Sequence, residues 1–214
     1  MKEGLSGSNL KRYATLLLGL TILAFGIAFT IKSGLGTSPI SSFPHVVDLV
    51  SPLSVGMATI LMHFIALGLQ ILIWGRRFKL IQLLQIPLGI AFGVLLDGAV
   101  WVLAFDVPTN YFLQWLLVLL GAVLTGLGVA VQISAKTVPL AAEGLVLAVS
   151  ERWNIEFGRV KVVNDIVSVL LAIVTSLIAS GTIQGVREGT VAASLLVGLV
   201  AGPTLRWLRR RHEQ

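Results

Sequence analysis

The chain lacks cysteine and has few charged residues. None of its 214 residues is cysteine, which excludes disulfides, thiolate metal sites and cysteine nucleophiles. Only 12% of the residues are Asp, Glu, Lys or Arg, whereas an average soluble domain has about a quarter. This scarcity of charge excludes an ordinary soluble protein whose surface faces water.

Apolar residues take the place of the missing charge. They make up 56% of the chain, and the mean hydropathy is +0.92. These values predict an integral membrane protein whose helices lie in lipid. The net charge of +6 could indicate nucleic-acid binding, but the basic residues flank apolar runs, as in cytoplasmic loops. We therefore expect no nucleic-acid partner.

The motifs of membrane-embedded hydrolases are also missing. The sequence contains neither H-E-x-x-H nor G-x-S-x-G. Its three histidines, His45, His63 and His212, lack the spacing of metal ligands. We therefore predict that the protein is not an enzyme and has no catalytic residues, no metal site and no cofactor.

Six apolar runs are long enough to cross a bilayer, which takes about 20 residues. The first run is too long for a cleaved signal peptide and lacks its exit pattern, so we expect it to be retained. The sequence predicts an all-α integral membrane protein with six transmembrane helices. The runs are 13–31, 54–74, 80–104, 111–133, 160–180 and 189–208.

Basic residues alternate between the two ends of these runs. Clusters precede the first run, separate the second from the third and the fourth from the fifth, and follow the sixth. By the positive-inside rule, both termini are expected to be cytoplasmic, as tails at 1–12 and 209–214. Residues 105–110, which contain no basic residue, are expected to form an external linker.

Several small and polar residues recur at a nearly constant offset of 100 to 109 positions. The pattern predicts two units of three spans, 13–104 and 111–208, and an odd number of spans inverts the second unit. Inverted repeats are common in secondary transporters. For the glycines themselves we favour a role in close helix packing. The matches are Gly19 and Gly121, Gly26 and Gly128, Pro39 and Pro139, Gly56 and Gly158, Gly89 and Gly198, Gly93 and Gly202, and Asp97 and Arg206.

Each unit has a break after its first span, at 32–39 and 134–139, and each break contains Lys, Thr and Pro. The segments that follow, 39–50 and 139–151, are too short to span. We favour re-entrant segments that begin a short helix inside the protein, where shielded backbone is tolerated. The alternative is a pair of helices lying at the membrane interface. Because of Pro44, the first short helix is expected to start late, at Ser41 or Ser42.

The fifth span carries Lys161, Asn164 and Asp165 on one helical face. Shifted by 102 positions, Thr59 falls on Lys161 and His63 falls on Asp165. Ionisable groups inside spans are costly and mark pathways or binding sites. Two alternatives stay open: Lys161 and Asp165 as a structural ion pair, and His63 as a hydrogen-bonded interior histidine.

Two groups of candidate residues follow from these patterns. Glu143 is a candidate for substrate binding, although a carboxylate one turn after Pro139 also suits a helix N-terminus. We predict that the breaks and the fifth span bind substrate through Lys32, Thr37, Ser38, Ser41, Lys136, Thr137, Glu143 and Asn164. We predict that a coupling ion or substrate is bound by His63, Asp97, Lys161 and Asp165.

Part of the chain resembles a known group. The run GIAFTIKSGLGTSP from Gly26 to Pro39, the Ser54-x-Gly56 that opens the second span and the glycine-rich third span resemble the YczE/YyaS/YitT group of bacterial membrane proteins. The resemblance covers most of the chain and is densest over 16–100. It implies a protein of the bacterial plasma (inner) membrane for which transport is suspected. The group is largely uncharacterised, so the resemblance implies no substrate and no site residues.

The favoured function is a secondary transporter of a small anionic or zwitterionic solute, with its site at the two breaks and with proton or sodium coupling. The alternatives are a channel for a small solute, a substrate-binding subunit of a larger transport complex, and a membrane regulator without a ligand. The expected partners are membrane lipid and a small-molecule or ion substrate. The glycine-rich helix faces would also allow two copies of the chain to pack together, so a homodimer is a further alternative.

Overall fold

A computed structural model describes residues 7–212, and its regular elements over that range are all helical. The predicted all-α class is confirmed. The elements are α1 (Gly7–Lys32), α2 (Pro39–Val50), α3 (Val55–Trp74), η1 (Gly75–Arg77), η2 (Leu80–Leu84), α4 (Gln85–Val102), α5 (Tyr111–Ser134), α6 (Ala141–Trp153), α7 (Phe157–Ser180) and α8 (Glu188–His212).

Six segments are long and apolar enough to cross a membrane, and they coincide with the six predicted runs. By this measure the chain is a multi-pass membrane protein. The third span differs in detail, since it opens with the 3-10 turn η2 and becomes α-helical only at Gln85. Pro87 lies in the first turn of α4, where its missing N–H breaks no hydrogen bond.

The predicted tails at 1–12 and 209–214 are in part helical, because α1 begins at Gly7 and α8 ends at His212. The rest of both tails lies outside the described residues. The predicted linker at 105–110 is a non-helical loop between α4 and α5.

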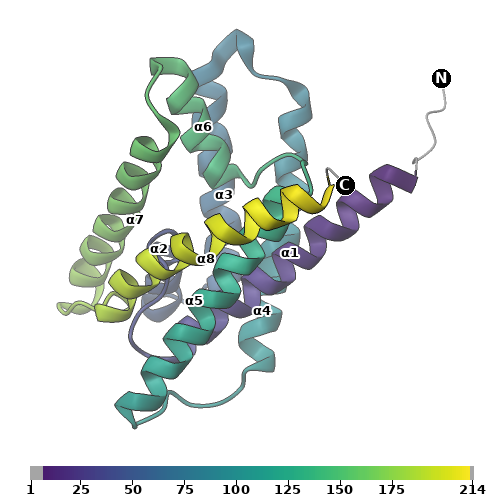
Figure 1. Cartoon of the computed structure of the whole chain (residues 1–214). Coiled ribbons are helices and arrows are strands. Elements are labelled where there is room, and N and C mark those ends of the chain that lie inside the picture. Colours follow the sequence, from purple (N-terminus) through teal and green to yellow (C-terminus); the bar gives the residue numbers. More distant parts are fainter. Residues whose placement is uncertain (1–6, 213–214) are drawn as a thin grey trace.

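Helices α1 and α5 cross at the middle of the bundle and pack on each other (Figure 1). A Cβ added at Gly19 would lie 3.1 Å from the carbonyl oxygen of Gly128, and one added at Gly26 would lie 2.8 Å from that of Gly121. Side chains at these positions would force the helices apart. The predicted packing role of these glycines is confirmed.

Each short helix packs on a long helix from the other half of the chain: α2 on α7, and α6 on α3. Helix α4 packs on α1, and α8 packs on α5. Helix α7 stands at one edge of the bundle (Figure 1). Within the described residues, α3 packs closely on α4, whereas α7 and α8 have no comparable contact.

The starts of the two short helices differ from the predictions. Helix α2 begins at Pro39 after its N-cap Ser38, so the predicted late start was wrong. Pro44 lies inside this helix, where it lacks only the bond that its own N–H would have made. Helix α6 begins at Ala141 after its N-cap Leu140, two residues later than expected.

Candidate functional site

A cavity of about 350 Å³ is enclosed by side chains from all eight α-helices. Its volume falls in the range of small-molecule sites, about 300–1,000 Å³. Most of the lining is apolar, with a few polar groups, as is usual for such sites. The polar lining residues are Ser38, Ser41, Thr59, His63, Thr125, Glu143, Lys161, Asp165 and Ser194.

Both short helices begin at this cavity. Ser38, Pro39 and Ser41 line it from the start of α2, and Leu140 and Glu143 line it from the start of α6. The first N–H groups of a helix have no partner within the helix and carry a partial positive charge. The cavity therefore receives two helix N-termini, one from each half of the chain.

Helices α3 and α7 add four further polar groups to the lining. Thr59 and His63 project from α3, and Lys161 and Asp165 project from α7. In each pair the spacing of four residues places both side chains on one helical face. The residues that correspond at an offset of 102 thus meet at one cavity.

His63 is buried without a hydrogen-bond partner. The residue is 5% exposed, and neither Nδ1 nor Nε2 is hydrogen-bonded. Its ring lies against Phe92, with 6.1 Å between the ring centroids. The ring therefore has no hydrogen-bond partner among the described protein atoms, and a hydrogen-bonded interior histidine would need water or a ligand as its partner. A buried polar group left without a partner costs about 1–3 kcal/mol, which a ligand in the cavity would relieve.

Glu143 is the second unpartnered polar group. Its Oε2 atom is buried and makes no hydrogen bond. Removal from water raises the pKa of this carboxyl group, and the lowering effects of its backbone hydrogen bond and of Lys161 are smaller. Glu143 also lines a second cavity of about 210 Å³ beside the second break. Its carboxyl group therefore lies where the two cavities adjoin.

Lys161 and Asp165 form an ion pair on α7 between Nζ and Oδ1. The two side chains are 32% and 27% exposed. The four-residue spacing on α7 brings the two side chains together on one face of the helix. The predicted pairing is present, and it lies in the wall of the central cavity.

Comparison with known proteins places the chain in a family. Residues 10–204 match the model of DUF6198, which is described as a family of unknown function. The chain belongs to this family. No curated protein and no solved structure matches it. Because the DUF6198 description assigns no activity, the function has to be argued from the geometry.

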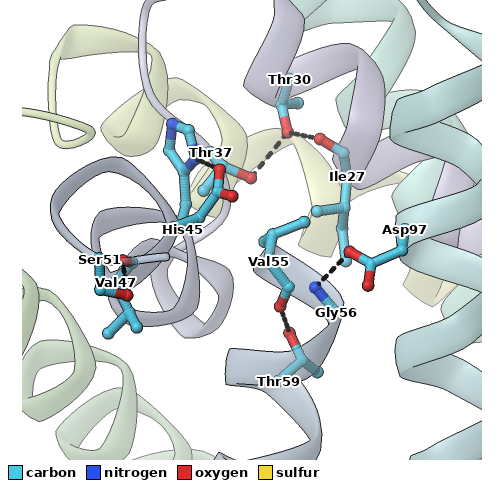
Figure 2. A network of polar contacts seen from close by, with 11 residues as sticks. Ile27, Thr30, Thr37, His45, Val47, Ser51, Val55, Gly56, Thr59 and Asp97 are labelled. Atoms are coloured by element: carbon cyan, nitrogen blue, oxygen red, sulfur yellow. Dashed lines mark hydrogen bonds and ion pairs between the residues drawn. The ribbon is translucent and has the colours of Figure 1, made fainter. Parts of the chain in front are cut away.

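The first break of this DUF6198 member serves the fold. Gly34 and Gly36 have φ angles of 72° and 96°, which glycine adopts at little cost. The Oγ1 atom of Thr37 lies 2.8 Å from that of Thr30 and ties the break to α1 (Figure 2). Thr37 and Lys32 were predicted to bind substrate, but neither lines the central cavity.

The second break turns without glycine. Lys136 has a φ angle of 50°, and its side chain is exposed. Arg12 donates from Nη2 to the carbonyl oxygen of Lys136 and from Nε to that of Ala135, the latter at 3.1 Å. Thr137 lines the second cavity, and Asn164 is absent from both linings. Of these three predicted substrate residues, none lines the central cavity.

Asp97 forms hydrogen bonds at the start of α3. Its carboxylate accepts hydrogen bonds from the Ser54 hydroxyl at 2.5 Å and from the Gly56 N–H at 2.7 Å. Figure 2 shows Asp97 of α4 facing the first turn of α3. Asp97 therefore accepts hydrogen bonds from donors at the N-terminus of α3. It is not among the residues that line the central cavity.

Several residues at or beside the site were not predicted from the sequence. Thr125 and Ser194 line the cavity, but neither is charged and neither carries a repeat match. Gln70 donates to the Ala141 carbonyl oxygen and to Gln85 Oε1, both at 2.9 Å. These bonds hold the start of α6 against α3 and α4. The Gln85 partner is 15 positions away, so no local pattern indicates the pair.

Proposed function

We propose that this protein is a secondary transporter of a small anionic or zwitterionic solute, which binds in the central cavity. The observation that carries the proposal is the convergence of two helix N-termini and the unpartnered His63 and Glu143 on one cavity. Helix N-termini favour a negatively charged group. Lys161 adds a cation, and Glu143 or Asp165 would accept an ammonium group. The protein is not proposed to catalyse a reaction.

Reciprocal contacts support an architecture of two inverted repeats. Gly19 faces Gly128 and Gly26 faces Gly121, which is the exchange of partners that a two-fold axis produces. The packing of α2 on α7 is matched by the packing of α6 on α3. In inverted-repeat transporters the substrate site lies at the interface between the repeats.

The short helices are proposed to be re-entrant. Helix α2 has 12 residues and α6 has 13, so each is about 18–20 Å long, less than the hydrocarbon core of about 30 Å. Both begin at a cavity that the spanning helices enclose. The breaks before them are backbone without regular structure, which is tolerated at that depth when protein surrounds it.

The orientation is proposed from charge. Arg77, Lys79 and Arg152 gather around one pocket where α3 and α6 end. A gathering of basic residues marks the cytoplasmic side. On this basis both termini are proposed to be cytoplasmic. The resemblance of the sequence to a group of bacterial membrane proteins supports the proposal that the protein lies in the plasma membrane of a bacterium, in contact with lipid.

Thermal unfolding of the full-length protein in detergent tests the site. The probes are the amino acids, short carboxylic acids, phosphate, sulfate and choline, each at two pH values. A ligand that binds the folded state raises the melting temperature. We expect a specific shift that is lost in Thr59→Phe, which fills the cavity, and kept in Leu72→Phe, which changes an exposed lipid-facing position.

Uptake of the hit into proteoliposomes tests transport. A carrier shows saturable uptake and counterflow that respond to a proton or sodium gradient. Flux without saturation or counterflow would replace the carrier by a channel. If no probe binds and no flux is measured, the transport proposal fails, and the partner-dependent and regulatory alternatives take its place.

A further inference from the structure

The second cavity begins where the central cavity ends. It lies between α5, the break at 134–139, α6 and α7. Four residues belong to both linings: Val129, Ile133, Glu143 and Phe157. Among the residues that line the second cavity, Glu143 is the one ionisable group. The rest of its polar lining is Gln132 and Thr137.

We propose that Glu143 is the proton-binding site of this protein and that its proton exchanges through the second cavity. The inference rests on the proposed transport function and specifies it, since it makes the proton the coupling ion. Glu143 binds one proton as the neutral acid and returns it as H⁺ to water at the second break, which leaves the carboxylate.

The two carboxyl groups at the central cavity are in different states. Asp165 is held by Lys161, so its charge is already compensated. Glu143 Oε2 has no partner, and a buried carboxylate without a partner is costly in its charged form. Glu143 is therefore the carboxyl group whose charge has to change with its surroundings.

Three ionisable side chains face Glu143 across the central cavity, and they come from α3 and α7. From α7, Lys161 and Asp165 act in opposite directions. From α3, His63 is the titratable residue in the lining. Helices α4, α5 and α8 contribute no ionisable group to either lining.

The route follows from the position of the break. Thr137 lines the second cavity, and its neighbour Lys136 has an exposed side chain. The cavity therefore extends from Glu143 to the second break, which also carries the exposed side chain of Lys136. Gln132 and Thr137 are polar groups along this path, which is what water between them requires.

Carbodiimide labelling tests the proton site without knowledge of the substrate. Dicyclohexylcarbodiimide adds to protonated carboxyl groups in apolar surroundings and forms a stable N-acylurea that mass spectrometry locates. In full-length protein in liposomes, we expect Glu143 to be labelled at pH 6.5 at least tenfold more than Asp165. Labelling should fall as the pH rises through the raised pKa of Glu143, because the reagent needs the acid form.

The labelling experiment uses the wild-type protein, so its outcome does not depend on whether a variant folds. Glu143→Gln should remove the label, and Leu72→Phe, at an exposed position outside both cavity linings, should leave it unchanged. Labelling of Asp165 in preference to Glu143, or labelling of Glu143 that does not fall as the pH is raised, would overturn the proposal.

Infrared spectroscopy tests the route. The C=O stretch of a protonated carboxyl group shifts when its proton is replaced by deuterium. In Thr137→Phe, which narrows the second cavity, exchange at Glu143 should slow at least tenfold relative to wild type, and Leu72→Phe should leave it unchanged. Equal rates in all three proteins would overturn the route.

The two proposals fail in distinguishable ways. If Glu143 labels with the expected pH dependence but no solute is transported, the proton site stands and the transporter falls. If uptake is saturable but ignores a pH gradient, and Glu143 is unlabelled, the transporter stands and the proton site falls.

Discussion

Helices α4 and α8 carry the same glycine spacing, yet they meet different surroundings. A Cβ at Gly93 of α4 would lie 2.7 Å from the carbonyl oxygen of Gly56 on α3. No atom lies within 4 Å of a Cβ built at Gly198 or Gly202 of α8. Accordingly, 33% of the span that contains α4 is buried, against 6% of the α8 span. Helices α3 and α4 are therefore closely packed, whereas α7 and α8 are not.

Glycines therefore permit two helices to approach closely but do not cause the approach. On α4, Asp97 accepts hydrogen bonds from the first turn of α3 and so holds the two helices together. The corresponding residue of α8 is Arg206, which has no acceptor for the N–H groups at the start of α7. Helices α7 and α8, which lack such hydrogen bonds over their described residues, do not pack closely at the glycines of α8.

The largest expected effect comes from Gly56→Ala. The added methyl group would overlap the carbonyl oxygen of Gly93, a backbone atom that can move only if α3 and α4 separate. We expect a loss of about 3 kcal/mol in the free energy of unfolding, measured by denaturant titration in mixed micelles. The matched control is Gly158→Ala, where the nearest atom lies 3.9 Å away. Equal losses in both variants would contradict the assigned difference between the two pairs.

Gly93→Ala and Gly202→Ala compare the glycine seams directly. Gly93→Ala should cost about 2 kcal/mol, because Ile60 and the Gly56 carbonyl would both have to shift. Gly202→Ala should leave the stability unchanged or raise it slightly, since alanine meets no atom there. The same titration measures both. A large loss in Gly202→Ala would mean that α8 packs on a neighbour at this seam.

Asp97→Ala removes the hydrogen bonds that Asp97 accepts at the start of α3. We expect a loss of about 1 kcal/mol, typical of a helix cap, together with unchanged ligand affinity, because Asp97 lies outside the cavity lining. Thermal unfolding with and without the ligand separates the two quantities. Ligand affinity that falls while stability is kept would return Asp97 to the binding site.

Asp165→Asn should have the smallest effect on stability, about 0.5 kcal/mol, because its ion pair with Lys161 is partly exposed. Uptake should nevertheless be lost, since the pair lies in the wall of the cavity. Size-exclusion chromatography followed by uptake measures both. A variant that fails to fold would instead establish the pair as a structural lock.

Much of the fold follows from local patterns. The six spans were predicted because hydropathy and length are properties of each run by itself. The first break was predicted at 32–39, and within it Gly34 and Gly36 have positive φ angles, which glycine adopts at little cost. The start of α2 was placed too late, because the penalty for Pro44 was weighed without the packing of α2 on α7.

The candidate site was predictable where helical period and repeat offset agree. Together they indicated that Thr59, His63, Lys161 and Asp165 share one environment, and all four line the cavity. Asp97 was predicted to bind a coupling ion or substrate because a carboxylate inside a span resembles a pathway residue, and this stays a prediction. Its donors lie 41 to 43 positions away, and no pattern in the sequence relates them.

The sequence by itself determined the six spans, the two breaks and the polar faces, because each depends on the hydropathy, backbone freedom and spacing of neighbouring residues. Only the tertiary structure decided which charged groups face the cavity, that Glu143 lies between two cavities, and that one glycine seam is closed while the other is open. These outcomes depend on which donors and acceptors from distant helices meet. The carboxylate of Asp97 accepts hydrogen bonds from N–H groups, whereas the guanidinium group of Arg206 only donates hydrogen bonds.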